Sequence, residues 1–285
     1  MIIDFHTHTF PDRIADSALE VLREKSHTRT FAPGTLAGLS ASMAASHVDA
    51  AVVMPVATNA RQVVHVNDAS IELNDRGGET GIYSFGCMYP DYEHPREEIG
   101  RLAKAGIKGI KLHPVYQGVD FDDPRYLRIL DRAGELGLMV LIHAGWDIGF
   151  PGVCHASPQM ILHAIRETGP LRLILAHMGG WRCWEEAKQL LAGTGVYIDT
   201  AVSLGRLTPN GDGHYRPDDL MMMDDAQFCD MVHAFGADHV LFGSDSPWND
   251  QAEDLARIRA LPLTEKEKRA LLGDNAAEML GLKTD

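Results

Sequence analysis

Apolar residues along the chain gather in short runs, with longer segments of helical period between them. Several runs, such as MVLI at 139–142 and LILA at 173–176, are apolar throughout and do not alternate with polar residues. Continuous apolar runs are typical of strands buried on both faces of a parallel sheet. Eight strands are predicted in this way, at residues 2–5, 48–54, 82–88, 107–112, 138–142, 171–176, 196–199 and 239–242.

The segments between these runs carry helix signals. Ser157 precedes Pro158 at a first-turn position, and Thr264 and Glu267 form a capping box. No linker or break in composition divides the chain, so a single domain over residues 1–285, built as a (β/α)8 barrel of the TIM type, is predicted. A doubly wound open sheet is the alternative, but its first strand would lead into a glycine-rich phosphate loop, where this chain has His-Thr-His.

Two polar stretches interrupt the alternation of predicted strands and helices. Residues 25–37 contain a Pro-Gly pair, and residues 201–219, after the seventh predicted strand, are rich in Gly, Asp, Pro and Arg. Loops on the strand-end side of a barrel lie over its catalytic face. Both stretches are therefore candidate covers of a substrate site, with plain surface loops as the alternative.

The net charge of the chain restricts the kinds of molecule that it is expected to bind. The 285 residues include 40 Asp and Glu but only 26 Lys and Arg, which gives a formal net charge of −14, and no run of five basic residues occurs. Proteins that hold nucleic acid or anionic membranes need basic surface to displace counterions. We therefore expect a small-molecule substrate, no nucleic-acid partner and no membrane partner, and we leave a homo-oligomer open.

Cysteine spacing and the N-terminal sequence indicate the cellular compartment of the protein. The four cysteines form no CxxC pair, so neither a zinc ribbon nor a disulfide scaffold is indicated. The first residues lack the basic and apolar parts of a signal peptide, and no stretch approaches the roughly 18 apolar residues of a membrane span. A cytoplasmic protein is predicted.

Histidines gather at the predicted strand ends. Five of the 14 histidines, together with one aspartate, lie within or just after the carboxyl ends of predicted strands. These ends meet at one face of a barrel, where catalytic groups are expected. The residues are His6, His8, His113, His143, His177 and Asp245.

Four of these residues offer a metal-binding donor set. His6 and His8 share one side of an extended segment, because alternate residues of a strand share a face. With His143 and Asp245 they supply three nitrogens and one carboxylate. Such a set suits Zn²⁺ or a similar divalent ion with a position left for water. For the His-Thr-His motif taken alone, a pair of structurally satisfied polar residues is the alternative.

Six motifs occur in order along the chain: DFHTH at 4–8, GIKLHP at 109–114, LIHAG at 141–145, LAHMGG at 175–180, FGSDSPW at 242–248 and GDNAAEMLGL at 273–282. Together they resemble the amidohydrolase-2 (amidohydrolase-related) family of the metal-dependent amidohydrolase superfamily. The resemblance implies a distorted TIM barrel with a divalent metal, usually zinc. By motif position it implies metal ligation by His6, His8, His143 and Asp245, with His177 beside the metal-bound water.

Asp245 and His177 are the expected catalytic residues. A divalent ion lowers the pKa of bound water toward neutrality and polarises a carbonyl group. Asp245 is expected to accept the proton of this water and to pass it to the leaving group. His177 is expected to hydrogen-bond the water or the developing oxyanion, and a core histidine satisfied by backbone is the alternative.

Lys111 has two interpretations. In binuclear members of the superfamily a lysine on the fourth strand is carbamylated and bridges two metals, and His177 would then bind the second ion. The interpretation we favour keeps Lys111 as an ammonium group that binds a substrate carboxylate. A buried lysine without a partner for its charge is not expected.

Four further residues are predicted to bind substrate because each follows a motif residue closely or belongs to a motif. His113 precedes a proline that by itself explains a turn. Arg182 suits a planar carboxylate. Trp146 and Trp248 could form the walls of a site for an aromatic or heterocyclic substrate, and packing under the loops is the alternative for both.

Three functions are compatible with these residues. The sequence favours metal-dependent hydrolysis of a small, carboxylate-bearing amide, ester or lactone. Non-oxidative decarboxylation is the alternative, because the same branch of the superfamily contains lyases that use the same metal-binding residues. A non-catalytic metal- or ligand-binding barrel is a third possibility, against which the complete donor set counts.

Overall fold

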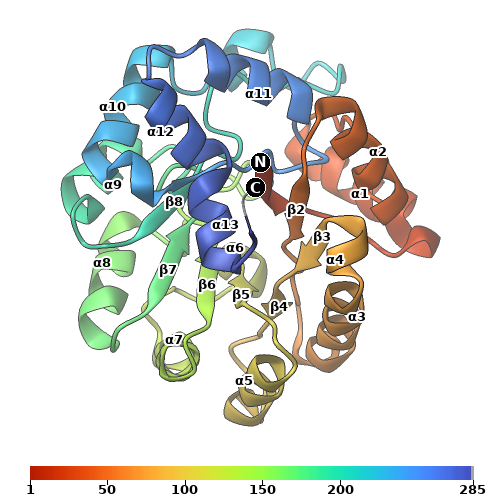
Figure 1. Ribbon diagram of the computed structural model, residues 1–285, viewed down its shortest axis with the longest axis vertical. Coiled ribbons are helices and arrows are strands. Elements are labelled where there is room, and N and C mark those ends of the chain that lie inside the picture. Colours follow the sequence, from red (N-terminus) through yellow and green to blue (C-terminus); the bar gives the residue numbers. More distant parts are fainter. Residues whose placement is uncertain (284–285) are drawn as a thin grey trace.

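Parallel strands lie at the centre of the molecule with helices around them (Figure 1). The computed structural model describes residues 1–283. In this part of the chain the strands form a three-stranded run, β1-β2-β3, and a six-stranded run, β4 to β9. The strands are β1 (Ile3–Thr7), β2 (Ala50–Val53), β3 (Ile82–Ser84), β4 (Gly86–Cys87), β5 (Gly109–Leu112), β6 (Met139–Ile142), β7 (Arg172–Leu175), β8 (Tyr197–Asp199) and β9 (Val240–Leu241).

The last strand returns to the first and closes the barrel. The backbone N–H of Phe5 donates to the carbonyl of Phe242 at 2.7 Å, and the N–H of His8 donates to the carbonyl of Ser246 at 2.7 Å. β3 and β4 together occupy the position of one predicted strand, so eight strand positions surround the axis. The predicted (β/α)8 barrel is confirmed.

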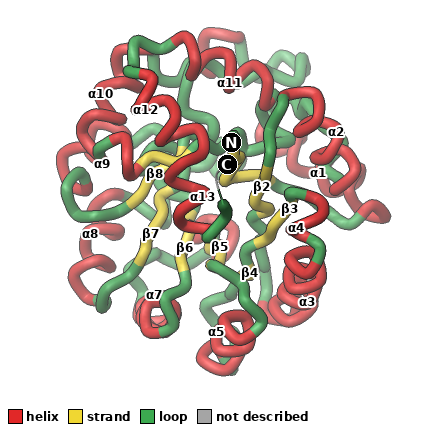
Figure 2. Tube along the Cα trace, viewed as in Figure 1, coloured by secondary structure: helices red, strands yellow, loops and turns green. Residues whose placement is uncertain are grey.

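Helices follow most of the strands and form the outer ring (Figure 2). Thr264 and Glu267 form the predicted capping box, and Ser157 caps the helix that begins at Pro158. The helices are α1 (Asp12–Ser26), α2 (Leu36–Ser46), η1 (Ala60–Gln62), α3 (Val63–Asp75), α4 (Gly77–Thr80), α5 (Pro95–Lys104), α6 (Pro114–Gln117), α7 (Pro124–Glu135), α8 (Pro158–Glu167), α9 (Trp184–Leu191), η2 (Pro217–Leu220), α10 (Asp225–Phe235), η3 (Ala237–His239), α11 (Gln251–Ala260), α12 (Glu265–Arg269), η4 (Ala270–Asp274) and α13 (Asn275–Leu280).

The third predicted strand is divided at Phe85. β3 pairs with β2, whereas β4 pairs with β5. On the side of β4 away from β5, the Asn67 side chain of α3 takes the place of a neighbouring strand. Its Oδ1 accepts from the N–H of Cys87 at 2.7 Å, and its Nδ2 donates to the carbonyl of Cys87 at 3.2 Å. Both backbone groups of Cys87 are thereby satisfied without a strand partner.

Alternate residues of the strands fill two separate cores. Side chains such as Phe5, Val52 and Leu141 pack inside the barrel, together with Leu280 of α13. The intervening residues, such as Val53, face the helices and join the larger outer core. The two apolar faces explain why these strands lack a polar alternation. The carboxyl ends of the strands are left for polar side chains.

The two polar loops pair with each other. Thr28 forms an antiparallel bridge with Pro209, and the N–H of Arg29 donates to the carbonyl of Thr208 at 2.8 Å. The predicted loop at 25–37 is shorter in the structure, since α1 extends to Ser26 and α2 begins at Leu36. The first loop thus lies against residues 208–210, part of the loop that follows β8.

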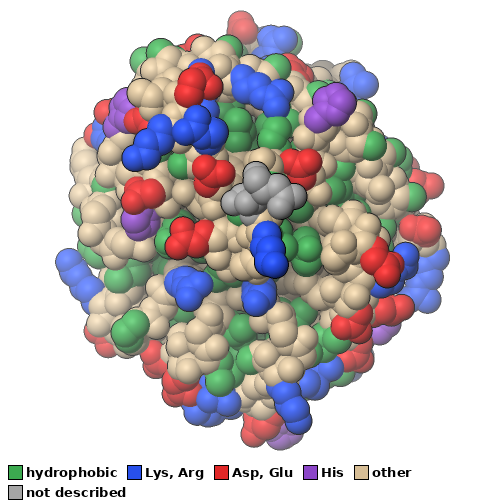
Figure 3. All heavy atoms as spheres, viewed as in Figure 1, with side chains coloured by type: hydrophobic (Ala, Val, Ile, Leu, Met, Phe, Trp, Pro, Cys, Tyr) green, Lys and Arg blue, Asp and Glu red, His purple; other side chains and the backbone are tan. Residues whose placement is uncertain are grey.

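Charged side chains of both signs are mixed on the surface. On the face in Figure 3, Lys and Arg side chains lie among Asp and Glu side chains. Within residues 1–283, no helix is both long enough and apolar enough to cross a membrane.

Candidate functional site

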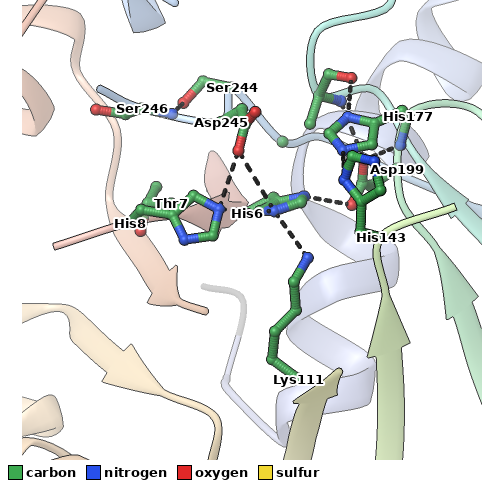
Figure 4. Close-up of polar contacts among 12 residues, drawn as sticks. His6, Thr7, His8, Lys111, His143, His177, Asp199, Ser244, Asp245 and Ser246 are labelled. Atoms are coloured by element: carbon green, nitrogen blue, oxygen red, sulfur yellow. Dashed lines mark hydrogen bonds and ion pairs between the residues drawn. The ribbon is translucent and has the colours of Figure 1, made fainter. Parts of the chain in front are cut away.

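Three predicted ligands meet where the ends of β1 and β9 adjoin (Figure 4). The Nε2 atoms of His6 and His8 lie 3.2 Å apart. Asp245 Oδ1 lies 3.0 Å from His8 Nε2 and 3.4 Å from His6 Nε2. The register between β1 and β2 is irregular from Asp4 to Thr7, so that Phe5 packs in the barrel core while the next residue, His6, also reaches the interior.

The hydrogen-bond partners of three histidines fix which ring nitrogen carries the proton. His6 Nδ1 lies 2.8 Å from a carboxylate oxygen of Asp199, and His177 Nδ1 lies 2.9 Å from the carbonyl of Ala201. His143 Nε2 lies 2.9 Å from the carbonyl of Trp146. Each oxygen can only accept, so the nitrogen facing it bears the hydrogen.

The remaining ring nitrogens of these three histidines therefore carry lone pairs. His143 Nδ1 and His177 Nε2 lie 3.0 Å apart, and neither has a hydrogen for the other. His6 Nε2 faces His8 and Asp245. A bound cation would stabilise such converging lone pairs, and an outer oxygen that fixes the tautomer is the usual companion of a metal-binding histidine.

The separations between donor atoms also fit a small divalent ion. Ligand atoms about 2.0–2.1 Å from a tetrahedral zinc lie about 3.3 Å from one another. His6, His8 and Asp245 have separations of 3.0, 3.2 and 3.4 Å. The donor chemistry and the spacing of these three residues thus fit the ion expected from the sequence.

Burial favours the neutral form of His6, His143 and His177, the form that metal ligation requires. It lowers the pKa values of His143 and His177 to about 4 and holds the pKa of His6 well below its usual value, with a further contribution from the nearby Lys111. Burial works against the charged form of Asp245, but the imidazoles of His6 and His8 more than offset it and hold the pKa well below the usual range. Asp245 is therefore a carboxylate.

Lys111 on β5 reaches the same centre. Its Nζ lies 3.2 Å from His6 Nε2, and its side chain is almost completely buried. Burial lowers the pKa of Lys111 to about 8, against the opposing effect of the carboxylates of Asp199 and Asp245. The ammonium form can donate to His6 Nε2 or to a bound anion, and the neutral amine is close enough in energy to be accessible.

Two site residues have left-handed backbones that non-glycine residues seldom adopt. His177 has a φ of 61°, and so has Asp245. The Asp199 carboxylate accepts from the backbone N–H of His177 at 2.9 Å, and the N–H of Asp245 donates to the carbonyl of His6 at 2.8 Å. Hydrogen bonds from neighbouring strands thus hold both side chains in place.

A second group of donors lies beside the first and contains His113, His143 and Asp147. The rings of His113 and His143 are stacked with centroids 4.4 Å apart. Asp147 Oδ2 lies 3.6 Å from His143 Nε2 and 3.8 Å from His113 Nε2, too far for hydrogen bonds. Since His143 Nε2 already donates to Trp146, its free lone pair points away from this group and toward His177.

The other predicted substrate-binding residues lie farther out. Trp146 contributes its carbonyl to His143, but its side chain is exposed. Trp248 is half-buried, and its backbone N–H donates to the carbonyl of Asp245 at 2.9 Å. Arg182 is exposed, stacks on Trp181 with its guanidinium 5.0 Å from the ring centre, and donates to the carbonyl of Asp219 at 3.4 Å.

Sequence reasoning missed three carboxylates around the site. Asp199 closes a predicted strand and holds His6, and Asp147 lies in the loop after β6. Asp4 joins β1 to the β9 loop, since it accepts from Gln251 Nε2 at 2.7 Å and from the hydroxyl and the N–H of Ser244. Burial raises the pKa values of Asp4 and Asp147 to about 6. A charged residue inside or at the end of an otherwise apolar strand was the available signal for Asp4 and Asp199.

Solved structures with the same fold cover nearly the whole chain. An uncharacterised TIM-barrel protein from Bordetella bronchiseptica matches with a TM-score of 0.75 at 17% identity and covers 98% of both chains. 5-Carboxyvanillate decarboxylase from Sphingomonas paucimobilis matches with 0.68 at 16% identity and 99% of both chains. A candidate 2-pyrone-4,6-dicarboxylic acid hydrolase from Pseudomonas putida matches with 0.65 at 17% identity, 100% of this chain and 98% of its own.

Decarboxylases recur among the other structural matches. They include 2,6-dihydroxybenzoate decarboxylase and a manganese-bound 5-carboxyvanillate decarboxylase from Novosphingobium aromaticivorans. At identities of 14–17% these likenesses establish the fold alone. No curated protein sequence matches the chain.

The family itself follows from the sequence. A family profile described as Amidohydrolase matches residues 3–282, which is nearly the entire chain. The motif order, the barrel and the strand-end histidines agree with this match. The chain belongs to the amidohydrolase-2 family of the amidohydrolase superfamily.

Proposed function

We propose that this family member is a metal-dependent carboxy-lyase that removes CO2 from a small aromatic or unsaturated carboxylic acid. One observation carries the proposal: the buried Lys111 Nζ lies 3.2 Å from His6 Nε2, so that a cationic side chain adjoins the candidate metal centre. A carboxylate substrate would meet two positive groups at this position. The decarboxylases among the structural matches support this choice over the hydrolysis that the sequence favours.

His6, His8, His143 and Asp245 would hold one divalent ion. When bound, the ion supplies a positive charge that attracts and polarises oxygen atoms of the substrate. Zinc is the ion expected from the sequence, whereas the structural match from Novosphingobium aromaticivorans carries manganese. We therefore propose a divalent ion of this group, with either metal to be tried.

Three side chains of this protein would then have separate roles in the reaction. Lys111 would bind and orient the substrate carboxylate through its ammonium group. Asp245, a carboxylate in the free site, would first take a proton from a substrate hydroxyl or a water molecule. It would then transfer this proton to the carbon that bears the carboxylate, and the carbon–carbon bond to CO2 would break, leaving its electron pair on the substrate. His177, with its Nδ1 proton held by Ala201, would present Nε2 as an acceptor for a substrate hydroxyl or a water.

Hydrolysis is the second candidate, favoured by the structural match to the candidate pyrone dicarboxylic acid hydrolase. The same two residues would serve it: His177 Nε2 could accept from a water molecule while Asp245 takes the water proton. Both reactions share a carboxylate-bearing substrate, so the product distinguishes them.

A panel of aromatic and unsaturated carboxylic acids tests the proposal. Protein loaded with zinc or manganese is expected to release one CO2 for each substrate consumed, and Lys111→Met should reduce kcat/KM at least about 100-fold, because a buried charge-assisted contact contributes about 3 kcal/mol. Exposed Lys104→Met is the matched control and should retain activity. A hydrolytic product without CO2 would assign the hydrolase, and turnover of neither kind, with either metal, would contradict both.

A further inference from the structure

Asp245, the acidic donor of the candidate metal centre, is held by the residues on either side of it in the chain. Its backbone has a φ of 61°, in the left-handed region that residues with side chains seldom adopt. The hydroxyl of Ser244 accepts from the backbone N–H of Ser246 at 3.0 Å and thereby spans Asp245 (Figure 4). The carbonyl of Ser246 in turn accepts from the backbone N–H of His8 at 2.7 Å. The turn that bears Asp245 is therefore bonded to itself and to the segment that follows β1.

The fully buried carboxylate of Asp4 lies behind this turn. Its Oδ2 accepts from the hydroxyl of Ser244, and its Oδ1 accepts from the backbone N–H of Ser244 at 3.0 Å. Oδ1 also accepts from the backbone N–H of His6 at 3.2 Å. One side chain is thus bonded both to the residue that precedes Asp245 and to the backbone of a histidine donor on β1.

A helix of the outer ring is joined to the same carboxylate. Gln251, the first residue of α11, is fully buried and donates from Nε2 to Asp4 Oδ2 at 2.7 Å. Four donor groups, from His6, Ser244 and Gln251, therefore converge on the two oxygens of Asp4. A carboxylate can accept from all of them, whereas an amide at this position would have a single acceptor oxygen. This arrangement explains why a buried position in β1 holds an aspartate.

We propose that Asp4 and Ser244 are positioning residues that hold Asp245 at its distance from the two imidazoles of the His-Thr-His motif. Asp245 Oδ1 lies 3.0 Å from one imidazole nitrogen and 3.4 Å from the other. Donor atoms that share one small divalent ion lie about 3.3 Å apart, and surrounding hydrogen bonds must hold such a site to within about 0.5 Å. The inference rests on the divalent-ion site of the proposed function and not on the reaction that the ion serves.

The Ser244 hydroxyl is the group through which this support reaches Asp245. Without it, the turn would lose its side-chain bond to Asp4 and its bond to the backbone of Ser246. A left-handed backbone at a residue such as Asp245 persists only where the surrounding contacts enforce it. The turn is therefore expected to relax and to move the Asp245 carboxylate relative to the imidazoles.

Ion binding by the full-length Ser244→Ala variant tests the inference without a substrate. The variant is expected to bind Zn²⁺ about 10–100-fold more weakly than the wild type, as for other outer partners of metal ligands, measured by competition with a chelator of known affinity. The visible absorption spectrum of bound Co²⁺ should also change, because it depends on the number and arrangement of the ligands. Asp4→Asn should show both effects. The double variant should bind Zn²⁺ within about twofold of Asp4→Asn, since Ser244 and Asp4 act through one hydrogen bond.

Thr200→Val is the matched control, because Thr200 holds the same loop one residue earlier. Its buried hydroxyl donates to the carbonyl of Gly243 and accepts from the N–H of Gly243, each at 3.0 Å. This variant is expected to have a lower Tm, as Ser244→Ala has, but to keep the wild-type Zn²⁺ affinity and Co²⁺ spectrum. Wild-type ion binding in Ser244→Ala, or an equal change in Thr200→Val, would overturn the positioning role alone. A wild-type protein that binds neither ion would overturn it together with the metal site of the proposed function.

Discussion

At the residue scale, the site depends on acceptors that hold the histidine rings from outside. Asp199 is the most connected of them: one carboxylate oxygen accepts from His6 Nδ1, and the other accepts from the backbone N–H groups of His177 and Ala201. Its carbonyl also accepts from Met178 at 2.7 Å. One buried carboxylate thus fixes the His6 tautomer and the left-handed turn that bears His177.

Asp199→Asn is expected to weaken metal binding about 10–100-fold while the fold persists, as for other outer partners of metal-binding histidines. The amide keeps one oxygen for the backbone N–H groups and turns its NH2 toward His6, so that His6 must carry its proton on Nε2, where the ion would bind. Competition with a chelator of known affinity measures the effect, with circular dichroism as the check on folding. Asp147→Asn is the control, since Asp147 makes no hydrogen bond to His143. Unchanged affinity in Asp199→Asn would contradict the tautomer assignment.

A site residue can be recognised in the sequence only when the residues next to it in the chain indicate its position in the fold. His6, His8 and Asp245 stand at the ends of recognisable strands, so the barrel topology alone brings them together, as the structure has it. The roles of Asp199 and Asp147 depend on partners far away in the chain, and a carboxylate at a strand end looks the same in sequence whether it holds a histidine or faces water. The role of Arg182 in substrate binding stays a prediction; its guanidinium stacks on Trp181, and its φ of 62° marks a left-handed turn that no motif indicates.

At the element scale, short apolar runs located all eight strand positions, and several of these runs are continuous because both faces of the strand are buried. The division of the third position at Phe85 could not be predicted, since its cause is a side chain on α3. Asn67 replaces the missing strand partner of Cys87 and is itself held by Glu98, whose Oε1 accepts from Asn67 Nδ2 at 2.7 Å. β4 in turn pairs with β5, the strand that carries Lys111.

Replacing Asn67 tests whether its hydrogen bonds to Cys87 stabilise β4. Asn67→Ala should lower the free energy of unfolding by about 2–4 kcal/mol, because it leaves the buried N–H and carbonyl of Cys87 without partners. Urea unfolding followed by fluorescence measures the change. Asn59→Ala, at an exposed cap before η1, should cost about 1 kcal/mol or less and serves as the control. An equal loss in both variants would mean that the Asn67 amide does not stabilise β4.

At the scale of the whole molecule, fold and family follow from the sequence, but the reaction does not. The motifs that establish the family carry the predicted metal-binding donors, and hydrolysis and decarboxylation can use the same donors. The sequence alone favours a hydrolase, and the lyase is a proposal carried by the position of Lys111 beside His6. The net charge of −14 describes the outer surface and is no guide to the site, where Lys111 would bind an anionic substrate beside the metal ion.

If an ion is bound at this site, its removal is expected to lower the thermal stability of the whole barrel. His6 on β1 and His8 just after it lie on one side of the closure, and Asp245 after β9 lies on the other. A shared ion would therefore bind the native barrel and not the unfolded chain. At a free metal concentration about 100 times Kd, such binding adds about 2.7 kcal/mol, which for a chain of this size corresponds to a rise in Tm of about 4–5 °C. Calorimetry of chelator-treated and metal-reloaded protein measures the shift. His8→Ala should give the same Tm with and without added metal, and an unchanged Tm in the wild type would show that no ion joins these strands.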